Sequence, residues 1–155
     1  MLWRIAAITP DYTADDLSGK GAEMTGGRWN RAGTPMVYCA SSIALACLET
    51  IVHYAVKNPL PLNRYLVRIE VPEEHYNRRT IFVPKDHPGW EVEPPGLVSM
   101  DWGTSWAGGN TTLIAEIPSV IIPEEPNLLI NPRHPDLVHV HAVLSRRWLY
   151  DSRLR

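Results

Sequence analysis

Fourteen prolines divide this chain of 155 residues into short segments. Proline removes a backbone N–H donor and breaks helices, so this spacing favours short strands over long helices. Only the segment 41–56 has the strong period of a helix, with Ser41 or Ser42 as N-cap and Pro59 as the stop. The pattern predicts an α+β protein rich in β structure, with strands at 2–8, 36–40, 64–71, 80–83, 112–117, 119–122, 127–130 and 137–143.

The length and charge of the chain limit its partners. With 155 residues and 45% hydrophobic side chains, we expect one domain over residues 1–155. Lys and Arg number 15 and Asp and Glu 17, so direct contact with nucleic acid is not expected. No apolar run reaches about 18 residues and no secretion signal is evident, so we expect no membrane contact. Cys39 and Cys47 match no metal or redox spacing and predict buried free thiols in a reducing cytoplasm.

A cationic, glycine-rich loop precedes the strand at 36–40. Arg28 and Arg31 lie there among Gly26, Gly27 and Gly33, which allow the backbone to approach a ligand closely. An arginine fork with exposed N–H groups suits a phosphate or pyrophosphate. The loop matches neither the dinucleotide-binding nor the Walker motif, and the alternative is an ordinary surface loop.

Glu49 is the only charged residue between Ile43 and Val52, in the middle of the predicted helix. A lone carboxylate on an apolar helix face is costly to bury, so it is typically paired, protonated or directed into a cavity. One interpretation is a salt bridge to an arginine. The functional interpretation is a carboxylate that faces a developing positive charge or acts as a general base.

Two further polar residues adjoin predicted strands. Tyr38 shares a strand face with Met36 and Ala40 and belongs either to the core or to a pocket. Ser119 lacks the Gly-x-Ser-x-Gly context of a nucleophilic serine, and it could be a turn hydroxyl that binds the backbone.

Tryptophans and histidines are the remaining candidates. Six Trp against one Phe is an unusual balance, and the irregular segment 84–110 holds three of them, so this segment either borders a pocket or fills the core. His139 and His141 lie on one face of a predicted strand but lack further ligands at a recognisable spacing. We therefore expect no metal site.

Four blocks of sequence resemble the RES-domain family, the toxin half of bacterial Xre-RES toxin-antitoxin pairs. These blocks are "WRIA", "GGRWNRAGTPMVYCASSIALACLETIVH", "LIAEIPSVIIPEEPNLLINPRHPD" and "YDSRL", and they span nearly the whole chain in order. The family is named after an Arg, a Glu and a Ser, which match Arg28, Glu49 and Ser119 here.

The resemblance implies a fold, a reaction and a set of roles. Family members resemble ADP-ribosyltransferases, which implies two packed sheets with few helices. They consume NAD by breaking the nicotinamide–ribose bond, in some members with inorganic phosphate as acceptor, so NAD is a substrate and no cofactor is expected. By resemblance, Arg28 would anchor an NAD phosphate and Tyr38 would orient the nicotinamide ribose. Glu49 would face the anomeric carbon, and Ser119 would position the substrate. The residues expected to line the pocket are Arg4, Gly27, Trp29 and Asn30.

The resemblance also implies partners and leaves alternatives. A cognate Xre-type helix-turn-helix antitoxin is expected to block the pocket, and the resemblance is compatible with a homodimer. The alternatives are transfer of ADP-ribose onto a macromolecular target, or a non-catalytic interaction module whose arginine loop binds an acidic partner segment.

Overall fold

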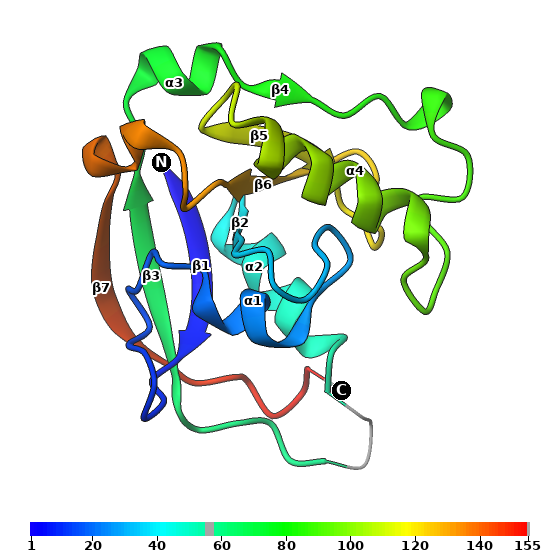
Figure 1. The fold of residues 1–155 in the computed structure, drawn as a ribbon. Helices are drawn as coiled ribbons and strands as arrows, with labels where there is room; N and C mark the ends of the chain where they lie inside the picture. The colour runs from blue at the N-terminus through cyan, green and yellow to red at the C-terminus, as the bar shows by residue number, and fades with distance from the viewer. Residues whose placement is uncertain (55–57, 155) are drawn as a thin grey trace.

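The computed structural model describes residues 1–54 and 58–154 and combines seven strands with short helices (Figure 1). The strands are β1 (Leu2–Ala7), β2 (Val37–Ala40), β3 (Arg64–Glu70), β4 (Thr80–Ile81), β5 (Ile114–Pro118), β6 (Pro126–Ile130) and β7 (His141–Trp148). The helices are α1 (Lys20–Thr25), α2 (Ile43–Ile51), α3 (Glu73–Asn77) and α4 (Leu97–Gly109), with 3₁₀ turns η1 (Pro84–Asp86) and η2 (Pro135–His139). The predicted β-rich α+β class with few helices is confirmed.

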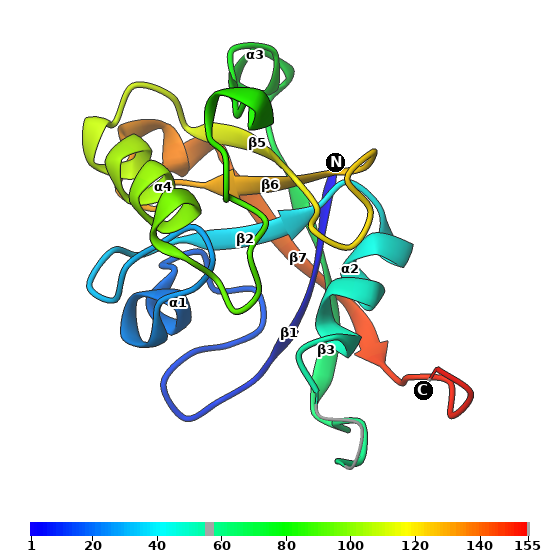
Figure 2. The same cartoon turned by 90° about the vertical axis from the view of Figure 1, so that its right-hand side faces the viewer.

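The strands form one hydrogen-bonded sheet in the order β4-β5-β6-β2-β1-β3-β7, where two packed sheets were expected. All neighbours are antiparallel except β4 and β5. The halves meet at β1 and β2, which share the single register pair Trp3 and Ala40, whereas β1 pairs with β3 from Leu2 to Ala7. Because one pair constrains twist weakly, the half with β2, β5 and β6 crosses the half with β1, β3 and β7 at a steep angle (Figures 1 and 2).

Because successive side chains of a strand point to opposite faces, apolar residues are buried on both faces of this sheet. The predicted alternation of β3 is confirmed, since Tyr65, Val67, Ile69 and Val71 all belong to one core cluster. Leu66, on the opposite face, is buried against α2. A third cluster packs under α4, so α2 and α4 cover different halves of the sheet.

Helix α2 begins as predicted and ends early. The Ser42 hydroxyl accepts a hydrogen bond from the Leu45 amide at 3.1 Å, which confirms Ser42 as the N-cap. The helix ends at Ile51, where Tyr54 N–H turns back to the Ile51 carbonyl. The rest of the predicted helix, residues 55 and 56, lies outside the described residues.

Several predicted elements are corrected. Residues 119–122 form a turn and not a strand, because the Ser119 amide binds the Glu125 carbonyl and reverses the chain. The segment predicted to be irregular contains α4, whose glycines hid its helical period. The strand predicted at 137–143 begins only at His141, because residues Pro135–His139 form the 3₁₀ turn η2, and it continues to Trp148 because it pairs with β3. Among the described residues, no helix has the length and apolarity needed to cross a membrane.

Gly103 sets the distance between α4 and the arginine loop. A Cβ atom at Gly103 would lie 1.8 Å from the Trp29 carbonyl oxygen, so any side chain there must push the helix away. The same helix contains Gly108, where a Cβ would meet nothing within 4 Å.

Substitution by alanine should have opposite effects on stability at these two glycines. Gly103→Ala should lower the free energy of unfolding by about 2 kcal/mol, because the overlap is with backbone and cannot be relieved by a rotamer. Gly108→Ala, the matched control, should raise it by about 0.5 kcal/mol through helix propensity. Urea unfolding followed by circular dichroism measures both, and a stabilising Gly103→Ala would contradict the packing described here.

Candidate active site

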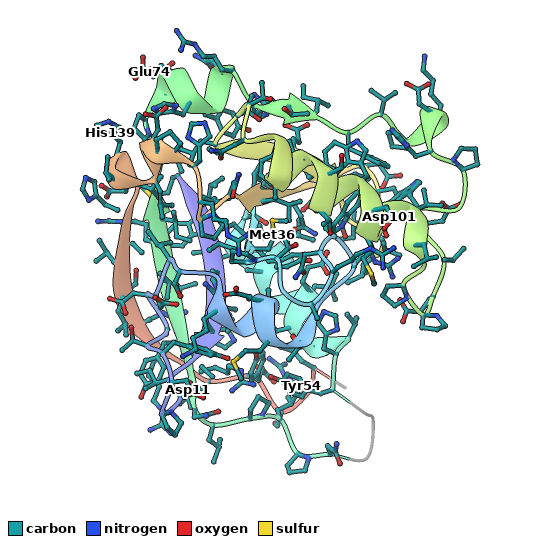
Figure 3. The ribbon with its side chains drawn as sticks, viewed as in Figure 1. Asp11, Met36, Tyr54, Glu74, Asp101 and His139 are labelled. Atoms are coloured by element: carbon teal, nitrogen blue, oxygen red, sulfur yellow. The ribbon has the colours of Figure 1, made fainter. Side chains whose placement is uncertain are left out.

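A cavity of about 850 Å³ opens on the sheet face between α2 and the loop that precedes β2. Arg28 and Glu49, the two charged residues singled out by sequence, both line it. Met36, labelled at the centre of Figure 3, and Tyr38 contribute to its wall from the start of the β2 segment. An adjoining cavity of about 210 Å³ shares five of its lining residues, namely Arg4, Tyr38, Glu49, His53 and Asn127.

Glu49 is half-buried and is held by neutral donors. Its Oε1 accepts a hydrogen bond from the Ser119 hydroxyl at 2.8 Å and another from the Asn127 amide at 2.5 Å. No described residue forms a salt bridge with Glu49, so the salt-bridge interpretation is not the one observed. The carboxylate therefore keeps its negative charge available to a ligand in the cavity.

Ser119 lies behind Glu49 and does not line the cavity. Its side chain is fully buried, and its oxygen also accepts from the amides of Ile121 and Ile122, each at 3.1 Å. With both backbone amides as donors, the hydroxyl proton is left to point at Glu49. Ser119 is thus both the turn hydroxyl and an anchor of the carboxylate.

Arg28 reaches the cavity with its guanidinium already engaged. Its Nη1 donates to the carbonyls of Val92 at 2.8 Å and Trp90 at 3.2 Å, and its Nη2 pairs with Glu93 Oε2 at 2.5 Å. The Arg28 side chain is 14% exposed and that of Glu93 is 72% exposed. The cation is therefore held from the protein side, while its acidic partner is free to move into solvent.

Tyr38 and Asn30 shape the arginine loop. The Tyr38 hydroxyl accepts from the Trp29 amide at 3.0 Å and donates to Asn30 Oδ1 at 2.6 Å. The Asn30 amide donates to the carbonyls of Ala22 and Thr34, and its side chain is fully buried. Burial raises the pKa of Tyr38 well above its usual value, with partial opposition from the Trp29 hydrogen bond and the Arg28 charge. Tyr38 is therefore neutral near pH 7.

The other candidates divide between the cavity and the scaffold. Arg4, Gly27 and Trp29 line the cavity, whereas Asn30 does not. A Cβ at Gly27 would lie 2.8 Å from the Tyr38 hydroxyl, so the loop needs glycine at this point. Arg31 binds Asp101 of α4 at the surface and is not among the cavity residues.

The tryptophan-rich segment borders the cavity through other residues. Trp90, Trp102 and Trp106 pack with Trp29 and Phe82 in the core under α4. From this segment, Glu93 and Pro95 line the cavity. These three tryptophans therefore fill the core, as one of the two interpretations expected. The loop between them borders the cavity, as the other interpretation expected of this segment.

The cysteines and histidines singled out by sequence, Cys39, Cys47, His139 and His141, do not line the 850 Å³ cavity. Both cysteines are buried and free, and burial raises the pKa of Cys39 to about 12. His139 lies with Glu74 and α3 on another part of the molecule (Figure 3). Across residues 1–54 and 58–154, no three His, Cys, Asp or Glu side chains are grouped so that they could hold a metal ion.

Asn127 is the site residue that sequence reasoning missed. It is the first inward-facing residue of β6, where it pairs with Ala40 of β2 on one side and Ile117 of β5 on the other. A polar residue at an inward position of an apolar strand was the available signal. The resulting arrangement can grip an anion at Arg28 and steady a positive charge at Glu49 in one cavity.

Several known proteins are similar to this chain over most of its length. The chain is 54% identical to "Prs ADP-ribosylating toxin" from Sphingobium sp. (strain YBL2) over 153 residues, 98% of this chain and 94% of that protein. It is 36% identical to "Toxin Res" from Yersinia enterocolitica over 158 positions, 100% and 99% of the two chains, and 36% identical to "Toxin Res" from Pseudomonas putida over 136 residues, 87% and 86%. The family model of the RES domain matches residues 1–152, and this chain belongs to the RES-domain family.

Proposed function

We propose that this protein is a toxin that binds NAD in the 850 Å³ cavity and breaks the bond between nicotinamide and ribose. The observation that carries the proposal is the pairing of one held cation, Arg28, with one carboxylate, Glu49, that has no cationic partner among the described residues. The cavity volume lies within the usual range for sites that enclose a small molecule or cofactor.

The charges of NAD fit this pair. Its pyrophosphate is anionic and suits the guanidinium of Arg28, which presents a planar set of N–H donors. Its nicotinamide ring is cationic, and Glu49 supplies the matching negative charge. Tyr38 packs at the same wall with a neutral phenol, which favours a role in orientation over proton transfer.

The reaction needs charge stabilisation more than an acid. When the ribose C1′–N bond breaks, its electron pair goes to the nicotinamide nitrogen, and the ring leaves neutral. The sugar carbon then gains oxocarbenium character, which a nearby carboxylate stabilises. An acceptor oxygen then bonds to C1′. An anionic oxygen of phosphate attacks without losing a proton, whereas water or a hydroxyl group gives up its proton, which Glu49 would accept in the proposed complex.

Two acceptor classes remain, and they leave different products. Phosphate or water would destroy NAD in solution, as the resemblance to NAD-consuming family members implies. Transfer onto a macromolecule is the second candidate, favoured by the name of the relative that is 54% identical. Glu49 would stabilise the sugar cation in both reactions, so the acceptor is the group that can reach C1′ within the cavity.

The alternative of a non-catalytic interaction module fits less well. Arg28 is 14% exposed and bound to two carbonyls, so it is poorly placed to bind an acidic segment at the surface. Toxins of this family imply a cognate antitoxin, and we propose one of the Xre type.

The first prediction is that the purified protein releases nicotinamide from NAD. Free nicotinamide should accumulate with inorganic phosphate or with a macromolecular acceptor, and NAD labelled in its adenylate part separates the two routes. Chromatography measures the ring, and label on a macromolecule identifies transfer. Stable NAD with phosphate, with water alone and with cell extract would refute the proposal.

Glu49→Gln should remove this activity without unfolding the protein. Gln keeps an Oε1 acceptor for Ser119 and Asn127 but lacks the charge, so kcat should fall by roughly 100-fold or more. Growth arrest on expression should disappear with it. Glu124→Gln serves as the matched control, because it changes an exposed carboxylate in the turn between β5 and β6 and should leave the activity unchanged. A fully toxic Glu49→Gln variant would contradict the electrostatic role.

Glu93→Gln should lower KM for NAD by about two- to fivefold. A phosphate at Arg28 must displace the exposed Glu93 carboxylate, and an exposed ion pair is worth up to about 1 kcal/mol. Arg28→Ala is a less clean test, because Arg28 also holds the carbonyls of Trp90 and Val92. Initial rates against NAD concentration give KM, with Glu91→Gln on the same loop as control. An unchanged or higher KM in Glu93→Gln would argue against phosphate at Arg28.

A further inference from the structure

Glu49 presents its two oxygens to different surroundings. Oε1 accepts both donors, from Ser119 and Asn127. Within the described ranges no group donates to Oε2, and Oε2 is not among the buried polar atoms that lack a partner. One oxygen is therefore tied to the protein and the other is open to the cavity that Glu49 lines.

We propose that Asn127 is a positioning residue for Glu49: its amide ties down Oε1 so that Oε2 faces the ligand. The inference rests on the proposed function of Glu49 and adds a residue to it. Asn127 is itself well anchored, because β6 pairs with β2 on one side and β5 on the other, opposite Ala40 and Ile117. Its donor at 2.5 Å is thus held by the backbone of three strands.

The other end of the Asn127 amide distinguishes it from two buried asparagines of the scaffold. Its Oδ1 is buried and has no hydrogen-bond partner. Asn30 and Asn131, two buried asparagines that organise the scaffold, use both ends of their amides: each Oδ1 accepts, from Tyr38 and from the Arg133 amide respectively. An unpartnered buried acceptor is unfavourable, so the fold keeps this amide at a cost in order to place its NH₂ on Glu49.

An amide is also the group that cannot exchange a proton with the carboxylate. The substitution Asn127→Asp would be nearly isosteric but would set two carboxylates at hydrogen-bond distance, where both do not stay ionised near neutral pH. With one shared proton, the introduced carboxyl group could donate to Glu49 as the amide does. Without that proton, the two groups repel and Glu49 is displaced.

The other titratable groups around Glu49 are common to wild type and variant. The cavity is lined by Arg4 from β1, Arg28 and Glu93 from the two loops, Tyr12 and Tyr38, and His53 from the turn after α2. Among these groups, His53 is the histidine, and it is the same in wild type and variant. The ratio of variant to wild-type kcat at each pH cancels its contribution.

Asn127→Asp therefore predicts a pH dependence that a structural residue would not produce. Relative to wild type, kcat should be about 30-fold lower at pH 8.5 and should recover to within about fivefold at pH 6, as the pair takes up its proton. KM for NAD should change less than about threefold. Asn77→Asp, which adds the same charge at an exposed asparagine of α3, should leave the ratio near one at every pH.

A second variant and a second readout separate the possible failures. Asn127→Ala should keep the wild-type melting temperature, because it removes the unpartnered oxygen together with the donor, and should lower kcat by roughly tenfold at all pH values. In the ¹³C spectrum, Asn127→Asp should add a carboxyl titration above the ordinary carboxyl range, and this titration should also move the Glu49 resonance.

Each outcome bears on one proposal. An active wild type whose Asn127→Asp variant follows a parallel pH profile would overturn the role of Asn127. An inactive wild type would overturn the proposed function, and the Glu49 titration would then still decide whether Asn127 controls the carboxylate: coupled resonances support the contact, and independent ones refute it.

Discussion

The central constraint in this structure is a carboxylate on an apolar helix that is held without a cation. Burying part of Glu49 costs desolvation, and a salt bridge would have offset it while neutralising the charge. Instead the turn after β5 directs the Ser119 hydroxyl, and the first inward position of β6 directs the Asn127 amide, at the same oxygen. Neutral donors hold the carboxylate oxygen without cancelling its charge. The geometry of α2, β5 and β6 at this end of the sheet is the geometry needed to bring these three groups together.

The same principle places the cation. The loop that carries Arg28 is shaped by neutral hydrogen bonds through Tyr38 and Asn30, and its guanidinium is held by two carbonyls. Its only acidic contact among the described residues comes from the exposed Glu93. Both charges of the site are thus fixed mainly by groups that do not neutralise them. The junction between β1 and β2 is one register pair wide, and the cavity is lined from both sides of it, by Arg4 of β1 and Tyr38 of β2.

Sequence reasoning reached the parts of this design that are local. The isolation of Glu49, the N-cap at Ser42, the alternation of β3 and the glycine-arginine loop are all visible within a few residues. It failed where contacts between distant segments decide the structure. Helix α4 forms despite Gly103, because that glycine lets the helix approach the Trp29 carbonyl, and residues 119–122 turn because Ser119 meets Glu125. Asn127 was missed as a site residue because its role depends on Glu49, which lies 78 positions away in the chain.

The balance of charges in the cavity indicates how substrate binding and reaction could be linked. Of its lining residues, Arg4 and Arg28 are cationic and Glu49 and Glu93 are anionic, so the cavity without ligand is close to neutral. In the proposed complex the pyrophosphate replaces Glu93 against the arginines, and Glu49 faces the nicotinamide. Bond cleavage then moves the positive charge from the departing ring to the sugar carbon, closer to a carboxylate that is already oriented. Because Oε1 is tied, this stabilisation requires no reorganisation of Glu49 at the moment of reaction, which is the condition under which a fixed charge contributes most to rate.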